Sequence, residues 1–231
     1  LETVLLIKYV DQHHKDQKML GKLADFWGVR TYNLAKLKYN EQYNLAYMHT
    51  VRNGRDQALS LPKDELLKFN VNLASKYKAA KGLIFLEDFI GDSKIEERIK
   101  EFVVKNKNEF ITTKDFETYI NSKSVKDLSW FFKSFLTNTQ QIDYKIKTLR
   151  SDQDSIYFNV KNIKSGETPI SLFTMKEGKI LTKSWLSAIG KDEDFVVTNN
   201  SADKLVLNYD QKVPEFNTKN NWKSVTGNDL S

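Results

Sequence analysis

Histidines are the first residues to consider for metal or acid–base chemistry, and the chain has three: His13, His14 and His49. His13 and His14 are adjacent, so their rings would point apart on a helix, and no histidine stands in a His-Glu-x-x-His motif. The absence of cysteine excludes thiolate catalysis, disulfides and cysteine-bound zinc. We therefore interpret the histidines as surface residues near a helix end and expect no zinc site within this chain.

Two arginines flank the single glycine of residues 51–55 (VRNGR). Guanidinium groups suit planar oxyanions, so Arg52 and Arg55 are candidates for holding a carboxylate or phosphate. A solvated loop explains the same residues, and we prefer that interpretation. No glycine-rich phosphate-binding loop is present.

The stretch 72–91 (NLASKYKAAKGLIFLEDFIG) would position the remaining candidates. Its apolar residues recur every three or four positions, which predicts an amphipathic helix that ends at Gly91. Residues 76–82 form a polar, small-residue patch near its start. Such a patch allows close approach of a ligand or a second backbone, and tight helix packing is the simpler explanation.

Helices are expected on both sides of this stretch. The apolar period predicts helices over the first residues up to His13–Asp16, over 17–27 (with Met19, Leu20, Leu23, Phe26 and Trp27 on one side) and over 33–48. A loop follows at 51–61, and Pro62 would open a short helix.

Capping residues predict three more helix starts after Gly91. Asp92 or Ser93 would cap the first, whose buried stripe is Ile95, Ile99, Phe102 and Val103. Thr112 with Asp115 would cap the second, and Ser124 the third. The third helix is dense in aromatic residues, which predicts burial on more than one side.

The hydrophobic period changes from helical to alternating at Asp143. Six short strands follow, separated by turn residues, which is typical of an antiparallel sandwich or barrel. The expected fold class is α+β with two domains: an α-helical domain over 1–142 and an antiparallel β-sandwich over 143–231. The predicted strands are 144–149, 155–160, 170–175, 179–185, 194–197 and 204–209.

Charge and hydropathy exclude some partners. The formal net charge is +6, from 36 basic and 30 acidic residues, without a block of five like charges. We therefore expect no nucleic-acid partner. No apolar run is long enough to span a bilayer, so we expect no transmembrane segment in this chain. The compartment stays open between the bacterial periplasm or cell envelope and the cytoplasm.

Residues 77–91 (YKAAKGLIFLEDFIG) resemble the helix after the zinc site in the aminopeptidase N family of zinc metallopeptidases, the gluzincins. Residues 113–116 (TKDF) and 127–136 (DLSWFFKSFL) look like the family's Asp-Phe and Leu-x-x-Phe-Phe segments. Residues 142–146 (IDYKI) look like its entry into a β-sandwich. Residues 1–4 (LETV) are similar to the segment directly after the family's third zinc ligand. The resemblance covers nearly the whole chain, and the order of the motifs carries it.

The resemblance implies that the chain is the C-terminal part of a zinc aminopeptidase that removes N-terminal residues from peptide substrates. Residues 1–142 would then be the remainder of a thermolysin-like catalytic domain. The zinc ligands would lie upstream of Leu1, so zinc belongs to the parent protein and the isolated chain is expected to be inactive. In that family zinc polarises the scissile carbonyl and activates a water.

The resemblance also implies that a tyrosine of the central helix donates a hydrogen bond to the forming oxyanion. Tyr77 is the candidate for this role, with an offset. When Lys78 is aligned with the lysine of the family's Tyr-x-Lys-Gly type motif, Lys76 takes the tyrosine position. Tyr77 then lies one residue late, turned by about 100° around the helix.

Two alternatives remain open. Beside the aminopeptidase fragment, the first alternative is a non-catalytic module that binds peptides or serves as a scaffold. The second is a degenerate peptidase homologue that has lost catalysis. The empty catalytic inventory motivates the first, and the offset of Tyr77 motivates the second.

Overall fold

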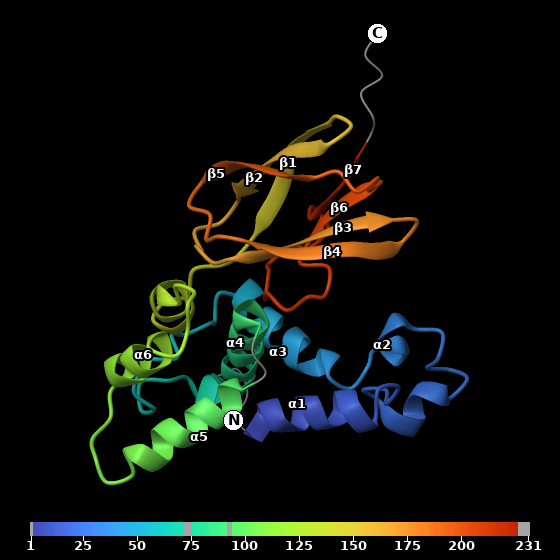
Figure 1. Ribbon diagram of the computed structural model, residues 1–231. Coiled ribbons are helices and arrows are strands. Elements are labelled where there is room, and N and C mark those ends of the chain that lie inside the picture. The colour runs from blue at the N-terminus through green and yellow to red at the C-terminus, as the bar shows by residue number, and fades with distance from the viewer. Residues whose placement is uncertain (1, 72–74, 92–93, 226–231) are drawn as a thin grey trace. The chain divides into compact units, whose positions relative to one another are not determined.

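The computed structural model describes residues 2–71, 75–91 and 94–225 (Figure 1). The chain divides into two compact units, Leu1–Ile84 and Phe85–Ser231. This division falls within helix α4 (Ser75–Ile90). The domain boundary between 142 and 143 that the sequence suggested stays a prediction.

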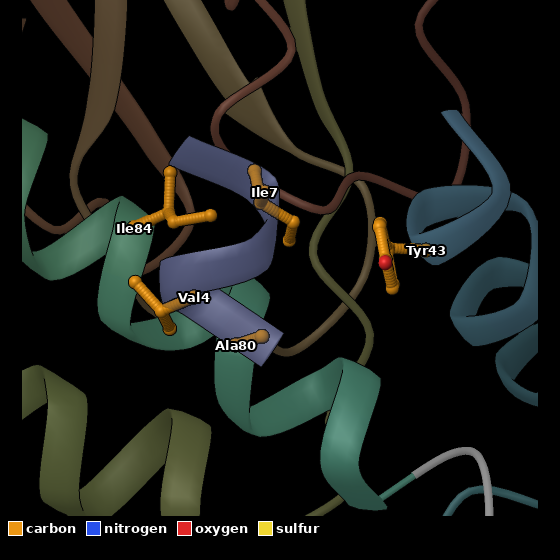
Figure 2. Close-up of a cluster of buried hydrophobic side chains, with 5 residues drawn as sticks. All are labelled: Val4, Ile7, Tyr43, Ala80 and Ile84. Carbon is orange, nitrogen blue, oxygen red and sulfur yellow. The ribbon is translucent and has the colours of Figure 1, made fainter. Parts of the chain in front are cut away.

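The first unit is built on α1 (Glu2–His13), α3 (Glu41–Arg52) and the first half of α4. Their apolar faces meet in one buried cluster, because residues three and four apart share a side of a helix. α1 ends at His13, as predicted. The cluster in Figure 2 consists of Val4, Ile7, Tyr43, Ala80 and Ile84.

The helix predicted over 17–27 is wrong. Only the short 3₁₀ helix η1 (Gly21–Asp25) forms there, and Gly21 has a φ of +53°, outside the right-handed helical region. Of the residues expected on one side of that helix, Met19 and Leu20 are half-buried, while Leu23, Phe26 and Trp27 are 68%, 54% and 76% exposed.

The helix predicted over 33–48 is interrupted. It forms as α2 (Asn33–Lys36) and α3, because residue 38 between them joins a β-bridge with residue 18. α3 continues to Arg52, so the predicted loop begins later, at Asn53. Pro62 opens a turn instead of a helix, in which the amide of Glu65 donates to the Pro62 carbonyl at 3.1 Å.

In α4, the described part of the predicted helix is confirmed, and Gly91 ends it with a φ of +76°. Residues 72–74 lie outside the described residues, as do the predicted caps Asp92 and Ser93. α5 (Ile95–Lys105) buries Ile95 and Phe102, whereas Val103 is 52% exposed, contrary to prediction, because it lies off the buried face.

The next two helices show how local capping decides a helix start. α6 (Thr113–Asn121) has the predicted capping box between Thr112 and Asp115. The predicted cap at Ser124 is wrong: its hydroxyl accepts from the Lys126 amide within a turn. Asp127 accepts from the Ser129 amide instead, before the π-helix η3 (Phe131–Leu136), whose phenylalanines are buried as predicted.

The β part of the second unit consists of two antiparallel sheets, with strand orders β1-β2-β5 and β4-β3-β6-β7 (Figure 1). All six predicted strands are confirmed, and β7 was missed because it is three residues long. Buried residues alternate along β2, which gives this sheet one core-facing side. The strands are β1 (Tyr144–Ser151), β2 (Ser155–Asn162), β3 (Ile170–Lys176), β4 (Lys179–Leu186), β5 (Asp192–Thr198), β6 (Lys204–Leu207) and β7 (Trp222–Ser224).

Aromatic rings join the helices of the second unit to its sheets. Phe85 is fully buried, and its ring centroid lies 4.4 Å from that of Trp130 and 5.7 Å from that of Trp185 on β4.

Among the described residues, no helix is long and apolar enough to cross a membrane.

Candidate functional site

The first half of α4 carries a buried ion pair one residue beyond Tyr77. Lys78 Nζ lies 2.7 Å from Asp56 Oδ2 and donates to the carbonyl of Gln57 at 3.1 Å. The side chains of Lys78 and Asp56 are only 3% and 10% exposed. Both charges are therefore withdrawn from water and depend on each other.

Burial controls the electrostatics of this pair. Desolvation lowers the pKa of Lys78 and raises the pKa of Asp56, while the attraction between the partners opposes both shifts. The Tyr47 ring lies beside the pair, with Lys78 Nζ 5.8 Å from its centroid. Burial, and then the charge of Asp56, raise the pKa of Tyr47 well above its ordinary value.

Hydrogen bonds from polar side chains hold the segment after α3 beside this ion pair. The amide of Asn70 donates to the Arg55 carbonyl at 2.8 Å and to Gln57 Oε1 at 2.7 Å. Gln57 Oε1 also accepts from the Leu67 amide at 2.7 Å. The site therefore uses the backbone of Arg55, while the Arg55 and Arg52 side chains are exposed. Anion binding by these arginines stays the less preferred of the two interpretations.

Tyr77 lies in the packed part of the unit. Its ring is half-buried and meets the ring of Tyr43 edge-on, with centroids 4.8 Å apart and planes at 82°. It packs against the cluster of Figure 2. Burial, and then Tyr39 and Tyr77, raise the pKa of Tyr43 to about 12. Lys76, at the motif's tyrosine position, is exposed.

The histidines lie apart from this site. All three are exposed, as expected of surface residues. His13 and His14 have ring centroids 4.8 Å and 5.6 Å from that of Tyr9, and the side-chain amide of Asn53 donates to the His49 carbonyl at 2.7 Å. Within residues 2–71, 75–91 and 94–225, no three His, Asp or Glu side chains converge to hold a metal.

Sequence reasoning missed the Lys78–Asp56 pair. The partners are separated by 22 positions, and most lysines on helices are solvated. The available signal was a lysine within the small-residue patch of an apolar helix, where a buried charge needs a partner.

Comparison with known proteins shows a similarity of fold. No protein-family model and no curated protein matches this chain. Among solved structures, the chain is similar to Legionella pneumophila aminopeptidase A, determined in complex with aspartic acid, with 17% identity and a TM-score of 0.53. The match covers 77% of this chain and 22% of that chain. The chain therefore shares the fold of part of a peptidase and spans about a fifth of its length.

Proposed function

We propose that the chain is the C-terminal part of a zinc-dependent aminopeptidase-like protein and does not cleave peptides by itself. Residues 1–142 would supply the helical remainder of a thermolysin-like catalytic domain, and residues 143–231 its β-sandwich. The shared fold with Legionella aminopeptidase A over 77% of the chain supports this proposal. Within the peptidases, the order of the gluzincin-like motifs favours the aminopeptidase N family.

Zinc would be bound by parts of the parent protein outside this sequence, as the resemblance of residues 1–4 to the segment after the third zinc ligand implies. The role of this chain would be to form one wall beside the bound peptide, with Tyr77 as the candidate oxyanion donor. A single donor of this kind is worth about 10²–10³-fold in kcat in other enzymes.

A second candidate is a degenerate homologue, and the packing around Tyr77 favours it. The tyrosine ring packs into the cluster with Tyr43, while the exposed side chain at the motif position is Lys76. A lysine ammonium can donate to an oxyanion but lacks the rigid reach of a phenol. Catalysis in the parent would then be altered or lost.

The test compares the 231-residue chain with the protein encoded by the complete gene. We expect the isolated chain to carry no stoichiometric zinc by elemental analysis and to hydrolyse no aminoacyl anilide. One zinc per chain would contradict this and return attention to His13, His14 and His49.

The complete protein separates the candidates. Hydrolysis that falls about 10²–10³-fold in Tyr77→Phe would support the oxyanion role, and hydrolysis unaffected by that change would remove it. A zinc-loaded complete protein without hydrolysis would support the degenerate homologue. A gene without His-Glu-x-x-His before Leu1 would exclude the proposal, and tight peptide binding by such a protein would favour the scaffold module.

A further inference from the structure

Residues 17–39 form a closed excursion between α1 and α3, which we name the 17–39 loop (Figure 1). Its two ends are joined by backbone hydrogen bonds, from Met19 to the Leu37 carbonyl and from Tyr39 to the Gln17 carbonyl, both at 2.8 Å. A β-bridge joins Lys18 and Lys38 between them. The loop leaves and re-enters the unit at one place, so its central residues share one small body formed by η1 and α2.

In this loop, small apolar residues are buried and several large apolar residues are exposed. Its small residues Ala24 and Ala35 are 0% and 2% exposed, whereas five of its larger apolar side chains are at least half exposed. Single exposed apolar residues are ordinary, but a gathered set indicates an interaction site. The exposed side chains are Leu23 at 68%, Phe26 at 54%, Trp27 at 76%, Tyr32 at 66% and Leu34 at 50%.

One side-chain contact and one contact between elements lie within this part of the loop. The rings of Phe26 and Trp27 have centroids 5.7 Å apart. η1, which carries Leu23, packs against α2, which carries Leu34. The apolar side chains therefore belong to one compact excursion.

The same loop concentrates positive charge. It contains five basic residues and one acidic residue, Asp25, so it holds a net charge of +4 of the chain's +6. Asp25 is engaged by Lys18 at 2.7 Å. The other four basic side chains are exposed: Lys22, Arg30, Lys36 and Lys38.

This combination favours a lipid surface over other partners. Protein–protein interfaces are enriched in aromatic residues and arginine but depleted in lysine, so the four lysines are the feature of this loop that disfavours a protein partner. Nucleic acids stack on aromatic rings but offer nothing to the exposed leucines. A bilayer interface accepts leucine, phenylalanine and tryptophan, places tyrosine and tryptophan at the headgroup level, and attracts Lys and Arg when the lipids are anionic.

We propose that the 17–39 loop docks on the surface of an anionic lipid bilayer. Phe26 and Trp27 enter the headgroup region, and the exposed basic side chains lie against the lipid phosphates. The attachment is peripheral and reversible, since a few side chains provide far less binding than a spanning helix. This inference concerns attachment, goes beyond the proposed peptidase relationship and uses the exposure of the loop in this chain.

The experiment is flotation of the 231-residue chain with vesicles made of equal parts phosphatidylglycerol and phosphatidylcholine, and with phosphatidylcholine alone. We expect binding to the anionic vesicles, weakening as salt is raised, and much weaker binding to the neutral ones. The double variant Phe26→Ser/Trp27→Ser should lose binding while keeping the circular dichroism spectrum, because both side chains are exposed. The charge reversal Lys22→Glu/Arg30→Glu should weaken binding at least about tenfold.

Matched controls lie outside the loop. Phe110→Ser removes a phenylalanine that is 94% exposed, and Lys63→Glu/Lys107→Glu reverses two exposed lysines. Both should bind vesicles nearly as the parent chain does. Equal binding to both vesicle types, or binding unchanged in Phe26→Ser/Trp27→Ser, would overturn the proposal. So would a loop-dependent dimer or loop-dependent binding of single-stranded oligonucleotide in a chain that ignores vesicles.

Discussion

At the scale of single residues, the Lys78–Asp56 pair is the most demanding feature of the first unit. A buried ion pair contributes little net stability when both partners are present, because desolvation offsets most of the attraction. Loss of one partner is costly, since the other charge stays buried without compensation. Substitutions of Lys78 and Asp56 therefore test whether water is excluded from the interior beside Tyr77.

We expect Lys78→Met to lower the free energy of unfolding by about 3–5 kcal/mol, measured by urea denaturation with circular dichroism. The double variant Lys78→Met/Asp56→Leu should recover most of that loss, because no lone charge remains. Lys76→Met is the control two residues away, on an exposed side chain, and should change little. A single variant as stable as the parent would show that water reaches the pair.

The second unit also contains a buried ionisable side chain, that of Glu215. It is 4% exposed, and its carboxylate accepts from the amide of Tyr144 at 3.1 Å and from the side chain of Asn208 at 2.8 Å. Asn221 is a third donor, at 2.5 Å. Burial still dominates these donors and raises the pKa of Glu215 to about 7, and burial also raises the pKa of the nearby Asp143.

This shift makes stability fall with rising pH. The folded state binds the Glu215 proton more tightly than the unfolded chain does, so its stabilising effect is complete below the ordinary pKa of 4.5 and lost as pH rises through about 7. A difference of about 2.5 between the two pKa values corresponds to about 3 kcal/mol. Unfolding measured across this range should show that loss in the parent chain.

Glu215→Gln should remove most of this pH dependence because the amide does not titrate. Glu109→Gln, on an exposed side chain, is the control and should leave the pH profile unchanged. If the parent chain and Glu215→Gln gave parallel profiles, Glu215 would not be the titrating group.

At the scale of elements, the aromatic contact of α4 with Trp130, the N-cap residue of η3, and with β4 organises the second unit. Phe85, Trp130 and Trp185 come from three separate parts of the chain, and Phe89 meets Trp130 edge-on at 5.5 Å. Stacked and edge-to-face rings add to the free energy gained from buried area. These contacts hold helices and sheet together within this unit.

Phe85→Ala should therefore lower the free energy of unfolding by about 3–5 kcal/mol, because it opens a cavity among rings from three elements. The control Phe110→Ala removes the same side chain at a position that is 94% exposed and should stay within about 0.5 kcal/mol of the parent. Chemical denaturation followed by tryptophan fluorescence is suitable, since Trp130 and Trp185 report on this contact. Equal effects of the two substitutions would contradict this assignment.

The element scale also shows what local sequence can and cannot predict. The strands were predictable because side chains alternate every two residues and turn residues such as Gly178, with a φ of +75°, separate them. The capping box at Thr112 was predictable because its donors and acceptors lie within four residues. The helix over 17–27 was not, because an apolar helical period does not reveal that a positive φ at Gly21 and a bridge at the loop base prevent the helix.

At the scale of the whole molecule, two divisions of the chain can be compared. The residue pattern places a domain boundary at 142/143, while packing separates Leu1–Ile84 from Phe85–Ser231. Both are consistent if the β-sandwich has its own core and also receives support from the second half of α4. If α4 were removed, Trp185 on β4 would lose its ring contacts with Phe85 and Phe89.

We expect a fragment of residues 143–231 to fold by itself, since its two sheets bury Ile146, Ile156 and Leu205 almost completely. It should melt at a lower temperature than a fragment of residues 85–231, because Trp185 loses Phe85 and Phe89. Circular dichroism melts of both fragments measure this. An unfolded 143–231 fragment would contradict the boundary predicted at 142.

The sequence by itself determined the fold class, the strands, most helices and the absence of cysteine chemistry, because these depend on local periodicity, capping and composition. It also pointed to Tyr77 and its offset, whose catalytic role stays a prediction. Only the tertiary structure decided that Lys78 is buried against Asp56, that Glu215 lies among distant asparagines, and that the 17–39 loop turns its large apolar side chains outward. The physical reason is that burial and pairing arise between segments far apart in the chain, where no local pattern records them.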